Sequence, residues 1–498
     1  MNVNPITRLD YPDPDVIRVE DTYYMVSTTM YFMPGCEILQ SFDLVHWEHV
    51  TYVYETLDHT DAQQLKSGQN IYGQGMWAAS LRYHEGRFYI CFVANDTRKT
   101  YLYTSEKIDG PWKKQLIEGF YHDGSLLFDE DGRNYIVYGN DEIWITELNE
   151  DLTAPKKDGL HRLLVSDHKN PELGYEGSHI QKINGYYYIF LVHSLRDRWM
   201  RTEACFYSDS LEGKFTGGDV LCDDRGYCGQ GVAQGGIVDT PDGKWYAMLF
   251  QDSGAVGRIP ILLPVTWKDH FPVFGQNGHV PEEIEVHSTR PGYIYQPLVG
   301  SDDFCNGLLP RWQFNHDPDP RYYHLDALQG TYTITTREVC TELTQAVNTL
   351  TQRMSYPSCA AEVTVDASAL KEGDVAGLCA LQGCYAAVGI TKHHGKYEVL
   401  MLDKKEDGIL DMTEGTVVES HQMDFRLEAD FCNMKDEARC YYRVNKGDWL
   451  PIGTVHKLYF KLDHFTGCRF GLFCYAAEET GGSACFRDFK YYDVDEIS

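Results

Sequence analysis

The sequence predicts an all-β chain in which a five-bladed β-propeller precedes a jelly-roll-like β-sandwich. Three observations carry this prediction: one motif occurs five times before residue 260, alternating apolar runs fill the chain beyond residue 301, and helical periodicity is scarce throughout. Repeats about 50 residues apart, each built of strands joined by hairpin turns, are the signature of propeller blades. Many short alternating strands separated by turn residues are typical of an antiparallel sandwich.

Each copy of the motif reads as a polar or aromatic residue, a short apolar strand, a turn rich in Asp, Asn or Gly, and an aromatic pair that opens a second strand. The first residue precedes a tyrosine by twelve positions in four copies and by eleven in the first copy. Equivalent positions of a radial repeat lie on a ring around the axis, so these first residues should face one another across the central channel. They are Asp13, Trp77, Asp123, Glu176 and Gln234.

Two of these ring residues also stand out locally. Pro12 and Pro14 fix the backbone on both sides of Asp13 at the entrance to a strand, so its carboxylate is held stiffly. Asp beside Pro is also common in simple turns. Trp77 follows a long polar segment, residues 52–74, of the kind that lies at a rim. Its ring is either part of a core or a stacking platform for a sugar face.

The remaining two carboxylates share a form, because Asp123 and Glu176 are each followed by a glycine. A residue without a side chain lets a ligand or another strand approach closely, although each pair taken alone reads as a turn. Two or three buried carboxylates around one axis would repel each other, so either a cation or catalysis must justify them. Arg258 lies between a glycine and an apolar strand, and it either points into the channel or lies on the surface.

The composition makes nucleic acid and anionic membranes unfavourable partners. A formal net charge of −30 disfavours nucleic acid and an anionic membrane, and it suits a neutral or cationic substrate. Residues 1–15 have neither a basic start nor an apolar run, and eighteen apolar residues never run together. The 15 cysteines have no C-x-x-C pair. We therefore expect reduced thiols in a soluble, cytoplasmic protein, and the oligomeric state is left open.

The repeat stops between Glu282 and Gly300, which predicts a domain boundary there. We place the propeller at residues 1–290, a linker at 291–300 and the sandwich at 301–498. Alternating runs that predict sandwich strands include residues 331–335, 361–366 and 397–402.

With these segments laid out, nearly the whole chain resembles glycoside hydrolase family 43, whose members are five-bladed propellers, often with a C-terminal β-sandwich. The C-terminal segments 471–475 and 481–486 look like the sandwich of the family's β-xylosidases. The propeller motifs that carry the resemblance are Pro12-Asp-Pro14, Gly75-Met-Trp-Ala78, Asp123-Gly-Ser-Leu126 and Glu176-Gly-Ser-His179.

The resemblance implies a role for each carboxylate: Asp13 is the general base, Glu176 the general acid, and Asp123 the pKa-modulating and orienting carboxylate. Chemistry agrees, because hydrolysis with inversion needs one carboxylate to deprotonate water and a protonated one to donate to the leaving oxygen. The carboxyl groups of base and acid should then lie roughly 6.5–9.5 Å apart. We expect Arg258 to hold Asp123 ionised.

One departure concerns metal binding. Family members usually have Gly-His at the start of the fifth blade, and that histidine helps to order a central metal, usually calcium, through water. This chain has Ala233 and Gln234 there. Gln234 keeps a carbonyl acceptor and two donors but cannot be protonated, which argues against a calcium ion in the channel. We expect no required cofactor, and family members with Gln at this position include active pentosidases.

The resemblance implies an exo-acting, inverting glycosidase that releases terminal α-L-arabinofuranosyl or β-D-xylosyl residues from small (arabino)xylan oligosaccharides. The two sugars present similar hydroxyls, so the preference between them stays open. Phe32, Trp77, Gln234 and Arg258 are the predicted substrate-binding residues, and a sandwich loop at residues 480–486 should help to narrow the pocket mouth. A non-catalytic carbohydrate-binding propeller is the alternative. A sialidase is disfavoured, because an arginine cluster and Asp-box turns are not evident.

Overall fold

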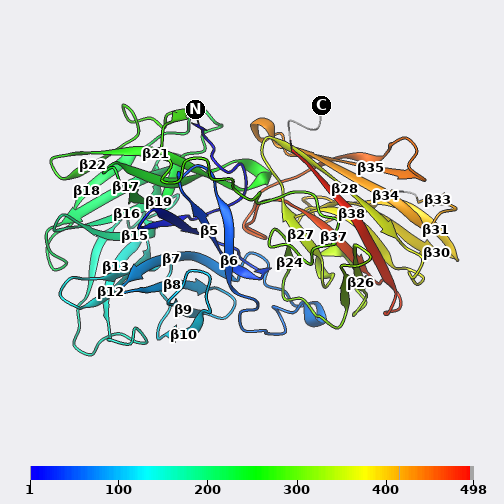
Figure 1. Ribbon diagram of the computed structural model, residues 1–498, viewed down its shortest axis with the longest axis horizontal. Helices are drawn as coiled ribbons and strands as arrows, with labels where there is room; N and C mark the ends of the chain where they lie inside the picture. Colours follow the sequence, from blue (N-terminus) through cyan, green and yellow to red (C-terminus); the bar gives the residue numbers. More distant parts are fainter. Residues whose placement is uncertain (1, 414, 494–498) are drawn as a thin grey trace.

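The computed structural model describes residues 2–413 and 415–493, and it confirms the all-β prediction, with a propeller and a sandwich side by side (Figure 1). In the described residues the helical elements are four short 3-10 turns: η1 (Lys66–Gly68), η2 (Gly254–Val256), η3 (Leu343–Gln345) and η4 (Cys432–Met434). Among these residues, none of the helices has the length and apolar character needed to cross a membrane.

Five four-stranded antiparallel sheets form the blades, and the strands of each blade follow one another along the chain. Blade 1 consists of β2 (Asp15–Val19), β3 (Thr22–Val26), β5 (Gly35–Ser41) and β6 (Glu48–Tyr54). Blade 2 consists of β7 (Met76–His84), β8 (Arg87–Ala94), β9 (Lys99–Ser105) and β10 (Lys113–Ile117). Blade 3 consists of β11 (Ser125–Phe128), β12 (Asn134–Asn140), β13 (Glu142–Leu148) and β14 (His161–Ser166).

Blades 4 and 5 complete the propeller. Blade 4 consists of β15 (Glu176–Ile183), β16 (Tyr186–Ser194), β17 (Arg201–Ser208) and β18 (Thr216–Leu221). Blade 5 consists of β19 (Val232–Asp239), β20 (Trp245–Asp252), β21 (Arg258–Lys268) and β22 (Phe271–Phe274). The first strands of successive blades contact one another in a closed ring, β2 to β7, β11, β15, β19 and back to β2. The repeat motif therefore places its first residues around one axis, as predicted.

The N-terminus is tied to the fifth blade. Strand β1 (Asn2–Val3) pairs with β23 (Glu283–Ile284), and the Asn4 side chain exchanges two hydrogen bonds with the backbone of Leu262, at 2.7 and 3.0 Å. These contacts hold the start of the chain against the last blade, which fixes the entrance to the strand that follows Asp13.

The sandwich consists of two antiparallel sheets. One has the order β25 (Tyr323–Asp326), β26 (Thr331–Thr335), β38 (Ser483–Asp493), β28 (Ser358–Asp366), β34 (Gln422–Asp430), β35 (Glu437–Val444), β36 (Leu450–Lys457). The other has the order β32 (Leu410–Met412), β31 (Lys396–Lys404), β30 (Ala386–His393), β29 (Val375–Leu381), β37 (Arg469–Tyr475), β27 (Leu350–Arg353), β24 (Gln313–Asn315), β4 (Phe32–Met33), with β33 (Thr416–Val418) also paired to β31. The strands predicted at residues 331–335, 361–366 and 397–402 lie in β26, β28 and β31.

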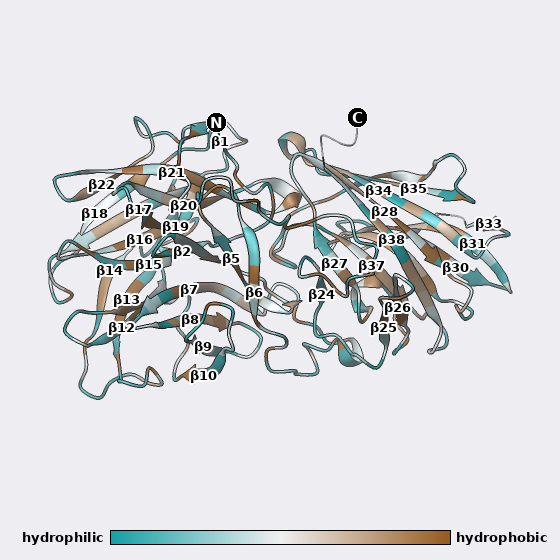
Figure 2. Cartoon of the chain, viewed as in Figure 1, coloured by the Kyte–Doolittle hydropathy of each residue, from teal (hydrophilic) through white to brown (hydrophobic). Residues whose placement is uncertain are grey.

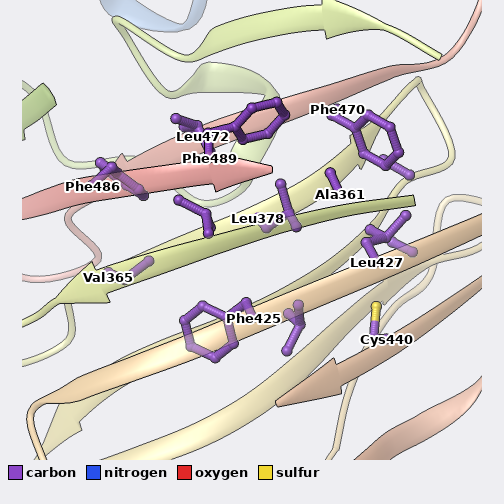
Figure 3. Close-up of a cluster of buried hydrophobic side chains, with 14 of the residues drawn as sticks. Ala361, Val365, Leu378, Phe425, Leu427, Cys440, Phe470, Leu472, Phe486 and Phe489 are labelled. Carbon is purple, nitrogen blue, oxygen red and sulfur yellow. The ribbon is translucent and has the colours of Figure 1, made fainter. Parts of the chain in front are cut away.

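The sandwich core lies between these sheets, where side chains such as Phe425, Leu427 and Phe470 interdigitate (Figure 3). Apolar and polar residues mix along the strands in both domains (Figure 2), as expected for sheets that bury one face more than the other. Two features join the domains. Strand β4, from the first blade's segment of the chain, forms the edge of a sandwich sheet, and Ala255, Val256 and Ile259 of blade 5 belong to the sandwich core.

Candidate active site

Two backbone features direct the five ring residues into one pocket. In blades 2, 4 and 5 the first strand shifts register at the ring position, between Met76 and Ala79, Glu176 and His179, and Ala233 and Gly236. Such bulges re-aim a side chain that would otherwise lie along the sheet. In blades 1 and 3, Asp13 and Asp123 precede their strands in the left-handed backbone region, with φ of 52° and 47°. All five ring residues line one pocket of about 640 Å³.

The carboxylate of Asp13 is held by a cation and a hydroxyl. Its Oδ1 accepts a hydrogen bond from Nη1 of Arg258 at 3.0 Å, and its Oδ2 accepts one from Oγ1 of Thr28 at 2.6 Å. Nε and Nη2 of Arg258 are buried and have no hydrogen-bond partner in the part of the chain described. The guanidinium also stacks on the sandwich, because its central carbon lies 4.3 Å from the ring centroid of Phe465.

This pairing corrects one prediction, because Arg258 holds Asp13 and not Asp123. The reason is the order of the blades: Arg258 opens β21 in blade 5, which is next to blade 1 in the closed ring, whereas Asp123 comes from blade 3.

Glu176 and Asp123 share a neighbour that the sequence reasoning missed, His122. Nε2 of His122 lies 3.4 Å from Oε2 of Glu176 and 3.5 Å from Oδ2 of Asp123. Glu176 also accepts a hydrogen bond from Asn140 at 2.8 Å, and Asp123 accepts one from the backbone N–H of Gly177 at 2.9 Å. His122 directly precedes Asp123 in the sequence, but adjacency alone does not show that both side chains enter the pocket.

The electrostatics of this group follow from burial and from charge. Burial raises the pKa of Asp123 to about 6, and the negative charges of Glu176 and Asp13 act in the same direction. The positive charge of His122 opposes this rise. Burial works against the charged form of His122, but the carboxylates of Asp123 and Glu176 outweigh it and raise the pKa of His122 to about 9. Between these two values Asp123 is negative and His122 is positive.

The predicted substrate-binding residues divide into two groups. Trp77, Gln234 and Arg258 line the pocket. Phe32 does not, which corrects that prediction. It is 1% exposed in β4, and the guanidinium of Arg469 lies 3.4 Å from its ring centroid. The aromatic loop that contains Phe32 pairs with the sandwich instead of facing the channel.

The sandwich does line the pocket, but not with residues 480–486 as predicted. Gly481 donates from its backbone to Thr336 at 3.0 Å, and Ser483 donates to Ala369 at 3.0 Å, so this loop is bound within its own domain. The sandwich residues that line the pocket are instead Met434, Phe460, Lys461, Leu462 and Phe465. Their segments carry no motif in the sequence, and their position depends on how the two domains pack.

Blade 4 adds a wall that the repeat pattern did not reveal. Trp199, with 44% of its surface exposed, precedes Arg201, and Arg201 forms an ion pair with Asp252 of blade 5. All three residues line the pocket. An exposed tryptophan beside an ion pair is suited to stacking on an uncharged ring while polar groups bind its hydroxyls.

Two groups of residues are candidate cation sites. His122, Asp123 and Glu176 offer ligand atoms within 4.8 Å of one another. These atoms already take part in hydrogen bonds, between His122 and Glu176 and from Asn140 and the Gly177 backbone. In the channel below them, Asp15 accepts hydrogen bonds from Arg82 at 2.8 Å and from Leu81 N at 2.7 Å, and His179 Nδ1 lies 3.1 Å from its other oxygen. Because a fixed guanidinium already pairs with this carboxylate, the channel residues do not fit a calcium ion.

The comparisons with known proteins identify the family. A sequence model described as glycosyl hydrolases family 43 matches residues 3–272, more than half of the 498 residues. The chain belongs to glycosyl hydrolase family 43. A second model, described as the beta-xylosidase C-terminal concanavalin A-like domain, matches residues 301–492. The family resemblance and the glycosidase class predicted from the sequence are thus confirmed.

Relatives and solved structures agree with this assignment. A beta-xylosidase of Formosa agariphila is 26% identical over 555 residues, which cover 99% of this chain and 89% of the relative. A solved structure described as a bifunctional GH43-CE protein of Bacteroides eggerthii is 42% identical with a TM-score of 0.93. It covers the whole of this chain, which spans 64% of that protein's length. A GH43 glycoside hydrolase engineered to display both endo-xylanase and exo-arabinofuranosidase activity is 27% identical, with a TM-score of 0.86 and 99% coverage of both chains.

Proposed function

We propose that the protein is an exo-acting, inverting glycosidase that releases terminal α-L-arabinofuranosyl or β-D-xylosyl residues from small xylan-derived oligosaccharides. The observation that carries the proposal is the meeting of three carboxylates, from blades 1, 3 and 4, in one pocket, where Arg258 pairs with Asp13 and His122 lies between Asp123 and Glu176. Arg82 of blade 2 donates hydrogen bonds to the first strands of blades 1, 3 and 4, and sandwich residues line the same pocket as the carboxylates. Such a pocket suits a chain end rather than the middle of a polymer.

In the proposed mechanism Asp13 is the general base. Arg258 and the hydroxyl of Thr28 donate hydrogen bonds to its carboxylate and orient it, so that it removes a proton from a water molecule on one face of the sugar. Glu176 is the proton donor to the leaving oxygen on the opposite face. Asn140 and His122 orient its carboxyl group.

Asp123 and His122 act on the donor in opposite directions. A negative Asp123 favours the protonated acid through charge repulsion, whereas a positive His122 favours the carboxylate.

The relatives support both candidate sugars. The Formosa agariphila protein is named a beta-xylosidase, and the engineered GH43 enzyme displays exo-arabinofuranosidase activity. Arg258 and Trp77 line the pocket together, and a guanidinium beside an indole ring suits a pentose with its hydroxyls on one side and an apolar face on the other. A panel of p-nitrophenyl pentosides measures the preference.

We also propose that the protein works in a reducing, cytoplasmic compartment and needs no metal cofactor. All 15 cysteines lie in the described residues and are free. Short oligosaccharides are the substrates that would reach such a compartment, and cell fractionation tests this location.

Two substitutions test the reaction. Glu176→Gln should reduce hydrolysis of natural xylosides or arabinosides by about 10²–10⁴-fold, because their leaving alcohols need a proton. It should slow aryl glycosides with acidic leaving groups by less than about tenfold, since these depend little on the donor. Asp13→Asn should lose activity on both classes, because without a base no water is activated.

The outcome of these assays separates the candidates. Equal losses on both substrate classes for Glu176→Gln would show that the acid is assigned wrongly. Full activity in Asp13→Asn would show that Asp13 is not the general base. Proton NMR of the first-formed anomer tests inversion, and a product with retained configuration would contradict it.

A further inference from the structure

The turn that carries Arg258 into the pocket is shared by the two domains. Asp252 and Arg258, at the ends of β20 and β21, line the pocket, while Ala255 and Val256 between them are 0% exposed and belong to the sandwich core. The carbonyl of Ala255 accepts hydrogen bonds from Cys468 N at 2.8 Å and from Nε2 of Gln382 at 3.0 Å. The placement of Arg258 therefore depends on the sandwich.

One buried side chain, the carboxylate of Asp10, joins the parts of this junction. Asp10 is 5% exposed and lies three positions before Asp13. Its Oδ1 accepts a hydrogen bond from the backbone N–H of Arg258 at 2.7 Å, and its Oδ2 accepts one from Gly467 N at 2.8 Å. Its own carbonyl accepts a hydrogen bond from Nε of Arg353, in the sandwich, at 2.9 Å.

Two glycines make room for this carboxylate. A Cβ atom on Gly257 would lie 2.4 Å from Oδ1 of Asp10, and a Cβ atom on Gly467 would lie 2.7 Å from Cβ of Asp10. Gly257 also has φ of 107°, in the left-handed region that favours glycine. The backbone on both sides is thus shaped around Asp10.

We propose that Asp10 is a positioning residue for the pocket. Its carboxylate fixes Arg258, which pairs with Asp13, and it also fixes Gly467, which follows the pocket-lining residues Phe460 and Phe465. One charged side chain thereby holds the propeller wall and the sandwich wall in register. The proposal rests on the proposed function, because the alignment that it preserves is that of the base.

The hydrogen bonds of the Asp10 carboxylate make Asp10→Asn an informative substitution. Both oxygens of Asp10 face backbone N–H groups, so Asp10→Asn keeps the shape but sets an amide N–H against one of them. A displacement of about 1 Å in a positioning residue can cost about 100-fold in rate. We expect kcat/KM on p-nitrophenyl β-D-xyloside or α-L-arabinofuranoside to fall about 10- to 100-fold, mainly in kcat.

Asp317→Asn is the matched control. Asp317 is also a buried aspartate at the domain junction, since its Oδ2 lies 2.9 Å from Nδ1 of His59 and its N–H donates to Gln63 O at 2.8 Å, but it is not among the residues that line the pocket. We expect this variant to keep kcat/KM within twofold. If Asp10→Asn does not fold, Gly257→Ala tests the same contact, because the three atoms nearest to a Cβ at that position all belong to the Asp10 side chain, and it should lower kcat similarly.

A double-mutant cycle distinguishes positioning from a general structural role. If Asp10 acts through Arg258 as well as Gly467, then Asp10→Asn should lower kcat/KM by a clearly smaller factor when Arg258 is already alanine than it does in the parent, measured on activated aryl pentosides. Additive losses, or an Asp10→Asn variant within twofold of the parent, would overturn the proposal.

A separate readout keeps the proposal apart from the proposed function. If the parent protein hydrolyses no pentoside, the proposed function fails, and hydrogen exchange then decides the role of Asp10. Faster exchange in peptides that contain residues 254–260 and 464–468 of Asp10→Asn would support the junction. Unchanged exchange there would overturn it.

Discussion

The three carboxylates in the pocket have different surroundings, although they come from equivalent positions of the repeat. Asp13 faces a guanidinium, Asp123 faces a backbone N–H, and Glu176 faces an amide and an imidazole. The repeat therefore supplies the carboxylates, and the neighbouring blades give each carboxylate its own set of polar contacts.

Two variants should move the pH profile in opposite directions. Between pH about 6 and about 9, Asp123 is negative and His122 is positive. Asp123→Asn removes a negative charge, which makes loss of the donor's proton easier, so the alkaline limb of kcat/KM should move down by roughly one unit. His122→Asn removes a positive charge, so the same limb should move up. Shifts of the same sign would contradict this account.

The carboxylates can be predicted from the amino-acid sequence, whereas several of their partners cannot. The motif spacing determines which residues share the ring, and it therefore predicts that Asp13, Asp123 and Glu176 converge. The partner of Arg258 depends on which blades adjoin, and the role of Phe32 depends on the pairing of β4 with the sandwich. His122 carries no periodic signal, because it lies one position before a ring residue.

At the scale of strands, Arg82 of β7 spans the channel. Its guanidinium donates to Asp15 at 2.8 Å, to Ser125 Oγ at 2.7 Å, and to the carbonyls of Leu81, Leu126 and Ile180. These partners come from blades 1 to 4, so the side chain joins the first strands of four blades. A permanent cation is thereby built into the axis.

Chelation should therefore have little effect. We expect incubation with EDTA, followed by gel filtration, to leave kcat/KM within twofold, because Arg82 supplies the positive charge on the axis. Arg82→Met should in contrast lower both activity and the unfolding midpoint, since it leaves Asp15 buried with a lost partner. A large loss with EDTA that added calcium restores would show that a metal is required.

At the scale of the whole molecule, the two domains share apolar surface as well as the pocket. Ala255, Val256 and Ile259 of the propeller belong to one sandwich core cluster, and Met30, Tyr31 and Phe32 pack in another with Leu343 and Phe473. The sequence predicted two domains with a linker between them. It did not reveal these contacts, because burial against a partner domain leaves no periodic pattern.

Truncation after residue 300 tests this dependence. The isolated propeller would expose those two apolar clusters and lose the sandwich residues that line the pocket, such as Phe465. We expect the fragment to aggregate or to bind a hydrophobic dye, and any soluble portion to have kcat/KM at least about tenfold below the full chain. Gel filtration, dye fluorescence and pentoside hydrolysis measure these effects.

Adding residues 301–498 in trans should recover part of the activity, because the two parts meet through packing and hydrogen bonds. A soluble, monomeric propeller with full activity would show that the sandwich neither completes the pocket nor stabilises the turn that carries Arg258.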